Sequence, residues 1–483
     1  MPEIAPMKYI STRGDGTHPP ISFAQALVAG LGRDGGLFVP EGGYPRLTQA
    51  ELTELAELPY GEVAVRIMAR FTAPDFTPTE LRPIIDEAYA TFTPPKANSA
   101  IIPITQIDHR IFLAELFHGP TLAFKDLPMQ PLARLFSSVL ATNKQEAVIL
   151  AATSGDTGSA ALAAFAGLPN IKVFVLYPEG RISPIQEKQM TAIAAKHANC
   201  LAVSVTADFD ACQALVKQLF ADLPFRDAVK LAAVNSINWG RIIAQIPYYF
   251  SLALACGGLT HPVSFAVPTG NFGNIFAGFI AWRMGAPIRR LVCASNRNDI
   301  LTRFFTSLVM ERRAVEPSLS PSMDIQVASN FERLLFELLG RDAGAVRRYM
   351  AEFAEGGRFA ISRHDLGEEI DLFTAACFDD KATLAEVARV AEATGVVLDP
   401  HSAIGIAAAR AVCDDDGDDG DNKGAVIALA TAHPAKFPEA VDQAIGQRPA
   451  LPPSTAGIVA GKGRKLSCEA TAAAVKALIK QNI

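Results

Sequence analysis

The chain has 483 residues, enough for two or three domains with sizeable apolar cores. Hydrophobic residues make up 49% and charged residues 19%, which is the composition of a globular protein and excludes a disordered one. The formal net charge of −6 gives no general attraction to nucleic acids or anionic membranes, so an anionic ligand needs a local cluster of donors.

The cysteines and the apolar segments indicate the cellular compartment of the protein. The seven cysteines are scattered and include no Cys-x-x-Cys pair, which argues against a disulfide framework and a cysteine-rich zinc site. The first residues show no basic region followed by an apolar run, and no apolar segment reaches membrane-spanning length. We therefore expect a cytoplasmic protein with no metal site, no nucleic-acid partner and no membrane contact.

Residues 1–100 are predicted to form an N-terminal module of their own. Residues 21–29 have the apolar spacing of a helix, which the glycine-rich segment that follows ends. That segment contains the spacing G-x-G-x-x-G at Gly30, Gly32 and Gly35, but a helix precedes it instead of a strand, so we do not interpret it as a dinucleotide site. Amphipathic helices are expected further on, around residues 49–71 and 79–92.

Lys125 follows a Gly-Pro turn and stands between Phe124 and Asp126. A lysine flanked by apolar residues is usually only a stem lying along a core edge, with its ammonium in water. An apolar pocket would instead lower the pKa of the amine, which a lysine needs in order to form a Schiff base. We therefore predict a covalent cofactor lysine, provided that other parts of the chain supply its partners.

From about residue 100 onward, short apolar strands alternate with helices, which predicts an α/β fold with largely parallel sheets. The expected strands are residues 147–152, 171–176, 201–205, 231–234, 263–267 and 425–430. We expect a small α/β domain over residues 101–245, which includes the lysine segment, and a large one over residues 246–483. The cofactor cleft would lie between the two.

Two loops have the layout of anion sites, because each follows a strand and opens a helix. The loop 269–274 suits a phosphate, although a tight turn explains its glycines equally well, and no G-K-[ST] ending is present. In the loop 153–158, Ser154, Asp156 and Thr157 either cap the helix or leave N–H groups for a substrate carboxylate. With Lys125, the two loops predict a cofactor that has an aldehyde and a phosphate, pyridoxal phosphate.

Thr431 follows the strand 425–430, at the end that faces the crevice in a parallel sheet. Its hydroxyl could face the pyridine nitrogen of the cofactor, or it could only hydrogen-bond to the backbone of a turn. A hydroxyl leaves that nitrogen less protonated than an aspartate does, so the ring would be a weaker electron sink.

Together these segments resemble the threonine synthase family, in its bacterial and fungal branch. The matching segments are ELFHGPTLAFKD from Glu115, TSGDTG from Thr153, LYPEGRISPIQEKQM from Leu176, NSIN from Asn235, TGNFGN from Thr269 and TAHPAKF from Thr431. YISTRG from Tyr9 and DGGLFVP from Asp34 are similar to the start of that family, and the matches keep the family order from about residue 8 to about residue 440.

The resemblance implies a pyridoxal-phosphate enzyme of the tryptophan-synthase-β fold type, which converts O-phospho-L-homoserine and water to L-threonine and phosphate as the last step of threonine biosynthesis. By match to the family motifs, Lys125 is the Schiff-base lysine and Thr431 is the partner of the ring nitrogen. The cofactor phosphate falls to Gly270, Asn271, Phe272, Gly273 and Asn274, and the substrate carboxylate to Ser154, Gly155, Asp156 and Thr157.

Asp156 departs from the asparagine of many relatives outside this branch, and a carboxylate beside the phenolic oxygen of the cofactor would be repulsive unless it is protonated or turned away. For the substrate phosphate the candidates are Asn235, Ser236, Asn238, Arg181, Lys188 and Arg241, although surface arginines and lysines are common in any protein. His118 could be a base or a structural histidine. We expect a monomer or a homodimer.

Other interpretations stay open at this point. A threonine or serine dehydratase, or a cysteine-synthase-like lyase, would use the same cofactor and the same lysine. A silent binding protein could keep the fold without the chemistry. Separately, the acidic run 414–421 is expected to be a solvated loop.

Overall fold

The computed structural model describes residues 6–95, 100–416 and 423–483. Its larger sheet is built from β3 (Ile104–Gln106), β4 (Ile111–Glu115), β9 (Val263–Pro268), β10 (Ile288–Ser295), β13 (Phe373–Cys377) and β14 (Val426–Ala430). Its smaller sheet is built from β5 (Ala147–Ala152), β6 (Ile171–Pro178), β7 (Cys200–Val205), β8 (Leu231–Ala232) and β15 (Leu466–Cys468).

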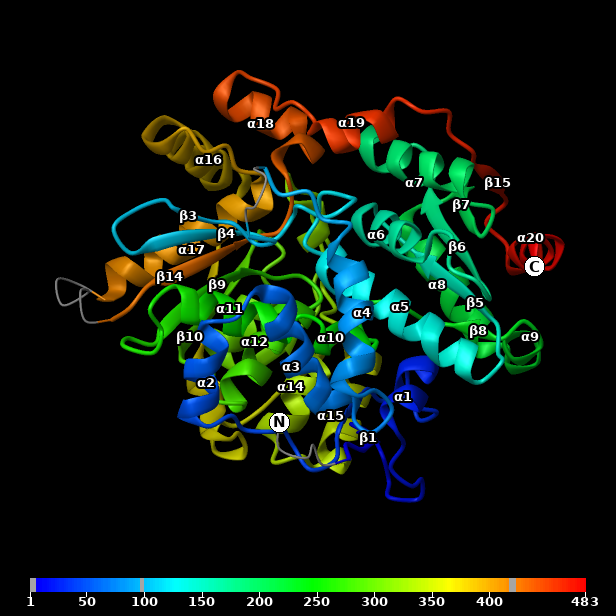
Figure 1. Cartoon of the computed structure of the whole chain (residues 1–483), viewed down its shortest axis with the longest axis horizontal. Helices are drawn as coiled ribbons and strands as arrows, with labels where there is room; N and C mark the ends of the chain where they lie inside the picture. The colour runs from blue at the N-terminus through cyan, green and yellow to red at the C-terminus, as the bar shows by residue number, and fades with distance from the viewer. Residues whose placement is uncertain (1–5, 96–99, 417–422) are drawn as a thin grey trace.

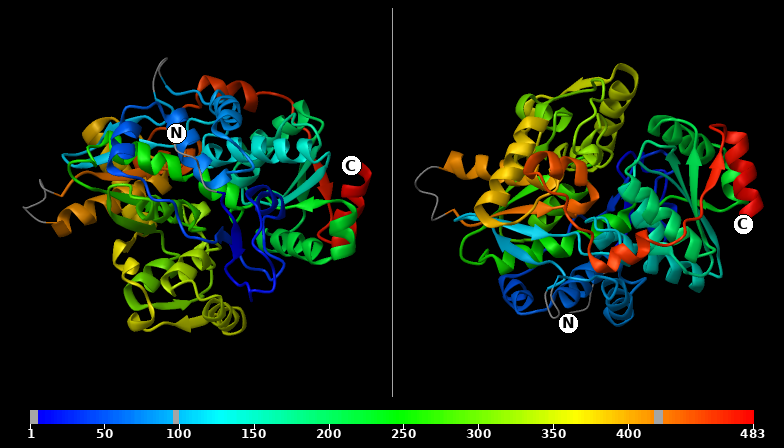
Figure 2. Two further views of the ribbon diagram at one scale, coloured as in Figure 1. Left: turned by 60° about the horizontal axis from the view of Figure 1, so that its bottom comes forward. Right: turned by 90° about the horizontal axis from the view of Figure 1, so that it is seen from above.

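The strand order is β13-β10-β9-β14-β4-β3 in the larger sheet and β15-β7-β6-β5-β8 in the smaller one. All neighbouring strands pair in parallel except β3 with β4. The two sheets lie in separate lobes that stand side by side (Figure 1; Figure 2, right). The predicted α/β class with largely parallel sheets is therefore confirmed.

The helices that cover the smaller sheet and link it to the larger lobe are α5 (Asp126–Thr142), α6 (Asp156–Phe165), α7 (Pro184–Lys196), α8 (Phe209–Ala221), α9 (Leu223–Ala228), α10 (Trp239–Ile243) and α11 (Ile246–Ala255). Those that follow are α12 (Gly273–Arg283), α13 (Ile300–Ser307), α14 (Phe331–Leu338), α15 (Ala343–Gly356), α16 (Asp380–Thr394), α17 (Pro400–Asp416), α18 (Pro438–Ile445), α19 (Pro453–Val459) and α20 (Ala472–Asn482). Two short strands, β11 (Val309–Glu311) and β12 (Arg358–Ala360), pair beside α15.

The N-terminal segment consists of β1 (Tyr9–Ser11), α1 (Phe23–Ala29), β2 (Phe38–Pro40), α2 (Gln49–Ala56), α3 (Tyr60–Thr72) and α4 (Pro78–Tyr89). One helix was expected over residues 49–71, but Pro59 separates α2 from α3, because a proline has no N–H for the helix and suits the residue before a new one. The ring of Trp239 packs on Tyr9 and Phe71, at centroid distances of 5.7 and 6.1 Å. This segment therefore shares its core with the rest of the chain.

Strand pairing crosses the expected boundary between the small and the large domain twice. The strands β3 and β4, whose residues fall within the range expected for the small domain, join the larger sheet through the pairing of β4 with β14. At the other end of the chain, β15 returns to the smaller sheet and pairs with β7, as the red strand in Figure 2 (right) shows. Which sheet edge a strand joins depends on the edges that the assembled fold leaves open, and local sequence does not encode this.

The acidic run is only partly as expected. Residues 417–421 of the expected loop lie outside the described residues, but α17 continues through Asp416. Asp416 is buried and pairs with Arg110 and Arg289 at 2.9 and 2.8 Å. The expectation of a solvated loop was wrong here, because both arginines come from distant segments of the larger sheet. Of the helices in the described ranges, none is both long and apolar enough to cross a lipid bilayer.

Candidate active site

The predicted site residues gather where the strands of the larger sheet end. The loop 269–274 follows β9, and Thr431 follows β14, which is the parallel neighbour of β9. The lysine segment reaches the same edge through an isolated bridge between Ala123 and Ala432. In addition, Phe124 N–H donates to the carbonyl of Thr431 at 2.8 Å. The fold thus brings Lys125, Thr431 and the loop 269–274 to the carboxyl ends of the strands, which is where parallel sheets bind their ligands.

Lys125 is the N-cap residue of α5 and is largely buried, with 15% of its side chain exposed. Its Nζ lies 3.5 Å from Oδ2 of Asp156. Burial lowers the pKa of this amine, Asp156 opposes the shift, and the positive charges of Arg241 and Lys436 add to it. The net shift is downward, which favours the neutral, nucleophilic amine.

Asp156 is the first residue of α6 and has three further side-chain partners. Its carboxylate accepts hydrogen bonds from Nε2 of Gln186 and Oγ of Ser322, both at 2.9 Å, and lies 2.6 Å from Nζ of Lys436. Burial alone would raise the pKa of this carboxyl, but Lys436 and Lys125 hold it well below its usual range. The carboxylate is therefore ionised and its charge is compensated by a lysine that the sequence reasoning did not single out.

The loop 269–274 contributes a set of hydrogen-bond donors at the site. Within the described residues, the N–H groups of Gly270 to Asn274 donate to no protein acceptor. Nδ2 of Asn274 is also buried without a partner. Phe272 holds φ at +64° immediately before α12, and its ring is fixed among three other phenylalanines. A Cβ at Gly270 would stand 2.8 Å from the carbonyl oxygen of Ser322, so only glycine fits there.

Asn330 holds this loop against the segment that follows β8. Its Nδ2 donates to the carbonyls of Ser236 at 3.0 Å and Asn271 at 3.1 Å. Its Oδ1 accepts from the buried Arg333, which also donates to Ile237 O at 2.6 Å. The sequence reasoning missed Asn330, because no local pattern marks a residue whose two partners lie far away in the chain.

We expect Asn330→Ala to weaken binding of pyridoxal phosphate by about 10- to 100-fold, since two backbone hydrogen bonds of about 1 kcal/mol each would be lost. A titration of cofactor absorbance on the apoprotein measures this. Asn330→Asp keeps the acceptor for Arg333 but lacks the Nδ2 donor, so it should weaken binding in the same direction. Wild-type affinity in both variants would contradict this role.

The loop 153–158 also retains unused donors. Oγ1 of Thr153 accepts from the N–H groups of Gly155 and Gly158, both at 2.9 Å. In the part of the chain that the structure describes, no acceptor pairs with the N–H groups of Ser154, Asp156 and Thr157. They begin α6, so a carboxylate placed there would meet both the donors and the positive end of the helix.

The six candidates for the substrate phosphate differ sharply in position. Arg241 is 4% exposed, and its side chain makes no hydrogen bond or ion pair with any described residue. Burial lowers the pKa of this guanidinium to about 10. Arg181 and Lys188 are exposed on the smaller lobe. A buried arginine without a counter-ion is costly, so Arg241 has the strongest need for an anion.

The NSIN segment provides the other three candidates. Asn235 is exposed, and Oγ of Ser236 lies 3.0 Å from Oγ of Ser329. Asn238 is fully buried: its amide donates to Leu27 O and Ala233 O and accepts from the N–H of Gly240. Asn238 therefore caps α10 and has no group left for a substrate, so we do not include it in the proposed site.

The two histidines near the lysine have protein partners. Nε2 of His118 lies 2.6 Å from Oε2 of Glu115. Nδ1 of His433 accepts from the N–H of Ala435 at 3.1 Å, and burial lowers the pKa of His433 to about 4. Both arrangements agree with a structural role, which was one of the two alternatives for His118.

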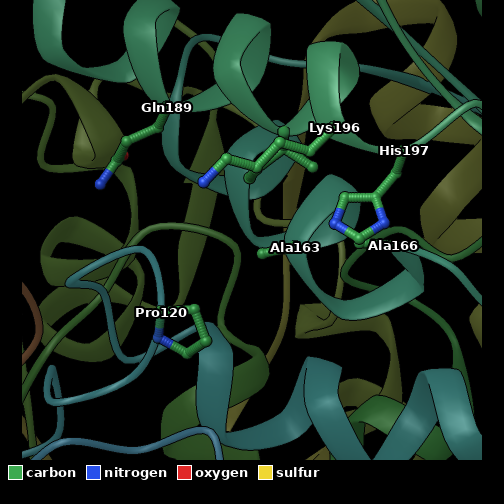
Figure 3. Close-up of a pocket in the computed structure, with 7 residues that line it drawn as sticks. Pro120, Ala163, Ala166, Gln189, Lys196 and His197 are labelled. Carbon is green, nitrogen blue, oxygen red and sulfur yellow. The ribbon is translucent and has the colours of Figure 1, made fainter. Parts of the chain in front are cut away.

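A cavity of about 190 Å³ lies beside the site, between α6, α7 and Pro120. Figure 3 shows Lys196 and His197 reaching toward it from the end of α7, with Pro120 on the opposite side. On its wall, Nε2 of Gln189 donates to Thr121 O at 3.2 Å, the carbonyl that also accepts from Nζ of Lys436 at 2.9 Å. The cavity therefore adjoins the hydrogen bonds to Thr121 O that hold Lys436, and Lys125 is not one of its lining residues.

The donors and the lysine fit pyridoxal phosphate. The amine of Lys125 suits its aldehyde, the unpartnered N–H groups and Nδ2 of Asn274 suit its phosphate, and the hydroxyl of Thr431, which no described residue binds, suits its ring nitrogen. Two parallel-sheet lobes with such a site between them define a pyridoxal-phosphate-dependent enzyme of the α/β class.

Models of protein families match three successive parts of the chain: threonine synthase N terminus at residues 8–89, pyridoxal-phosphate dependent enzyme at 97–366, and threonine synthase, C-terminal, at 402–479. The threonine synthase of Pseudomonas aeruginosa is 43% identical over 477 residues, which cover 99% of this chain and 98% of that protein. The chain belongs to the threonine synthase family, and its cofactor is pyridoxal phosphate.

Solved structures agree with this assignment. The crystal structure of threonine synthase from Brucella melitensis with pyridoxal phosphate bound has a TM-score of 0.91 and 44% identity, covering 99% of both chains. Threonine synthase from yeast has a TM-score of 0.92 and 36% identity, covering 100% of this chain and 99% of that one. The family predicted from the sequence motifs is thus confirmed.

Proposed function

We propose that the protein converts O-phospho-L-homoserine and water to L-threonine and phosphate. The single observation that carries this choice of substrate is the buried guanidinium of Arg241, which has no anionic partner although it lies close enough to Lys125 to lower the pKa of that amine. Serine and threonine, the substrates of the dehydratases, have no phosphate group that could pair with the guanidinium of Arg241. A phosphorylated amino acid has one.

Pyridoxal phosphate, when bound, makes the α proton of an attached amino acid acidic and stores the electrons that are released. The residues of the chain supply the remaining steps. Lys125 Nζ, freed when the substrate amine takes its place, removes the proton from Cα and then from Cβ, so that phosphate leaves from Cγ. Lys125 then returns one proton to Cγ, which becomes the methyl group, and a second one to Cα. Water adds its hydroxyl at Cβ, and its remaining proton goes to the released phosphate. An amine of lowered pKa suits both directions of transfer.

Substrate positioning follows from the same geometry. The N–H groups of the loop 153–158 hold the carboxylate, while Arg241, with Asn235 and Ser236 beside it in the chain, holds the phosphate. The hydrogen bond from Ser322 to Asp156 joins the larger lobe to α6 of the smaller one. We propose that this link forms part of a closed state that keeps bulk water from the reacting carbons.

The test is a product assay on the purified protein with pyridoxal phosphate. O-phospho-L-homoserine should yield threonine and inorganic phosphate in equal amounts, measured by amino-acid analysis and a phosphate assay. L-serine and L-threonine are the comparison substrates, and neither should give a keto acid at a comparable rate. Keto acid from threonine without phosphate release from phosphohomoserine would identify a dehydratase instead.

We also propose a reducing, cytoplasmic setting. All seven cysteines are free thiols, and four of them are buried. Proteins of oxidising compartments generally pair their cysteines, so unpaired thiols support this proposal.

A further inference from the structure

Lys436 is a fully buried cationic residue at the site. It ends a 3-10 turn, Pro434–Lys436, directly after β14 and Thr431, and its side chain is 0% exposed. Its Nζ lies 2.6 Å from Oδ1 of Asp156 and donates to Thr121 O at 2.9 Å. A lysine this deep needs a partner for its charge and acceptors for its N–H groups, and Asp156 and Thr121 O supply these.

At the site, the cationic side chains outnumber the carboxylates that contact them. Lys436 and Arg241 both act on Lys125, while Asp156 is the carboxylate that contacts the two lysines. Asp156 is 2.6 Å from Lys436 but 3.5 Å from Lys125, so Lys436 is its principal partner. Asp126 also acts on Lys436, but its carboxylate is used by the N–H and hydroxyl of Thr121.

We propose that Lys436 is a positioning residue that neutralises Asp156, so that Lys125 is left free to lose its proton and bond to the cofactor aldehyde. This rests on the proposed function, in which Lys125 is the cofactor lysine. In that bond the neutral Nζ gives its electron pair to the aldehyde carbon, and the aldehyde oxygen leaves as water with the two amine protons. A protonated amine has no electron pair to give.

The pair also explains how a buried carboxylate can stand at the start of α6. An ionised carboxylate bound to a buried ammonium is neutral overall, yet it still accepts hydrogen bonds from Gln186 and Ser322. Its Oδ1 lies against Lys436, so the negative charge that would repel the phenolic oxygen of the cofactor is compensated. Lys436 therefore supplies the compensation that Asp156 lacks within its own loop.

Removing Lys436 should raise the pKa of Lys125 for two reasons. The positive charge that disfavours a second ammonium would be lost, and Asp156 would be left with Lys125 as its main cationic partner. A raised pKa means a smaller neutral fraction at neutral pH, so the covalent bond should form more slowly there and at its usual rate only at higher pH. The other titratable groups that act on this cluster are His401 on Asp156 and His433 near Lys436.

The experiment is stopped-flow loading of the apoprotein with pyridoxal phosphate from pH 6 to 10, followed by the absorbance of the covalently bound cofactor. Lys436→Met should load about 10-fold more slowly at pH 7 than the wild type, with its profile moved about one unit upward, since one pKa unit is a factor of ten. Asp156→Asn together with Lys436→Met removes both charges and should return the profile to within about 3-fold of the wild type, because a neutral pair can replace a buried ion pair.

A wild-type profile for Lys436→Met would overturn the proposal, and so would a double variant that is as slow as the single one. If the single variant does not fold by thermal melting, the double variant decides: loading at the wild-type pH supports the proposal, and loading only at higher pH overturns it. Failure of the proposed function looks different, because then wild-type protein would take up no covalent cofactor, or Lys125→Ala would take it up equally well.

Discussion

Lys125→Ala is expected to abolish covalent attachment of pyridoxal phosphate and to lower kcat on O-phospho-L-homoserine by at least about 1,000-fold, because one amine is asked both to bond to the cofactor and to move two protons. The absorbance of the covalently bound cofactor should be missing from the purified variant. Threonine and phosphate should fall together, since both depend on the same proton transfers.

The fold of that variant should survive. Lys125 is largely buried, with a long contact of 3.5 Å to Asp156, so its removal takes away a desolvated charge and not a tight ion pair. Asp156 keeps its closer partner, Lys436. The matched control is Lys217→Ala, because Lys217 is exposed on α8 of the smaller lobe. Covalent cofactor in Lys125→Ala, or equal losses in both variants, would refute the role given to Lys125.

Arg241→Met should raise KM for O-phospho-L-homoserine by about 100-fold or more, because a charge-assisted, bidentate contact with phosphate contributes about 3 kcal/mol. The same variant should melt at the wild-type temperature or above it. A buried guanidinium with no partner costs free energy in the folded protein, and methionine removes that cost without leaving a large cavity. Lower activity with equal or higher stability is the signature of a binding residue.

Two phosphates are present in the reaction, and the cofactor content separates them. If Arg241 binds the substrate phosphate, Arg241→Met retains cofactor at wild-type affinity and only KM changes. If the variant loses cofactor instead, Arg241 belongs to the cofactor phosphate site with the loop 269–274. Arg448→Met is the control, because Arg448 is exposed and its ion pairs with Glu439 and Asp442 lie at the surface. An unchanged KM together with unchanged cofactor affinity would contradict both assignments.

The strands and the chemically distinctive loops could be predicted from the sequence alone. A buried parallel strand is a short apolar run, and a helix that starts directly after a glycine-containing loop leaves its N–H groups unpaired wherever it occurs. For this reason β5, β9 and β14 fall within a residue or two of expectation, and Thr431 and the loop 269–274 meet at one edge of the sheet. Lys125 could also be identified from the sequence, because its setting between a Gly-Pro turn and apolar neighbours is local.

The electrostatic state of the site was decided by tertiary structure. Asp156 could be identified from its loop, but the cation that neutralises it, Lys436, follows a strand of the other lobe. Asn330 and Arg333 tie together segments that lie far apart in the chain. Likewise, β4 lies in the residue range of the expected small domain but pairs in the larger sheet, and β15 lies in that of the expected large domain but pairs in the smaller sheet. Periodicity and turn chemistry act over a few residues, whereas the pairing of buried charges and of sheet edges is settled only when distant segments pack together.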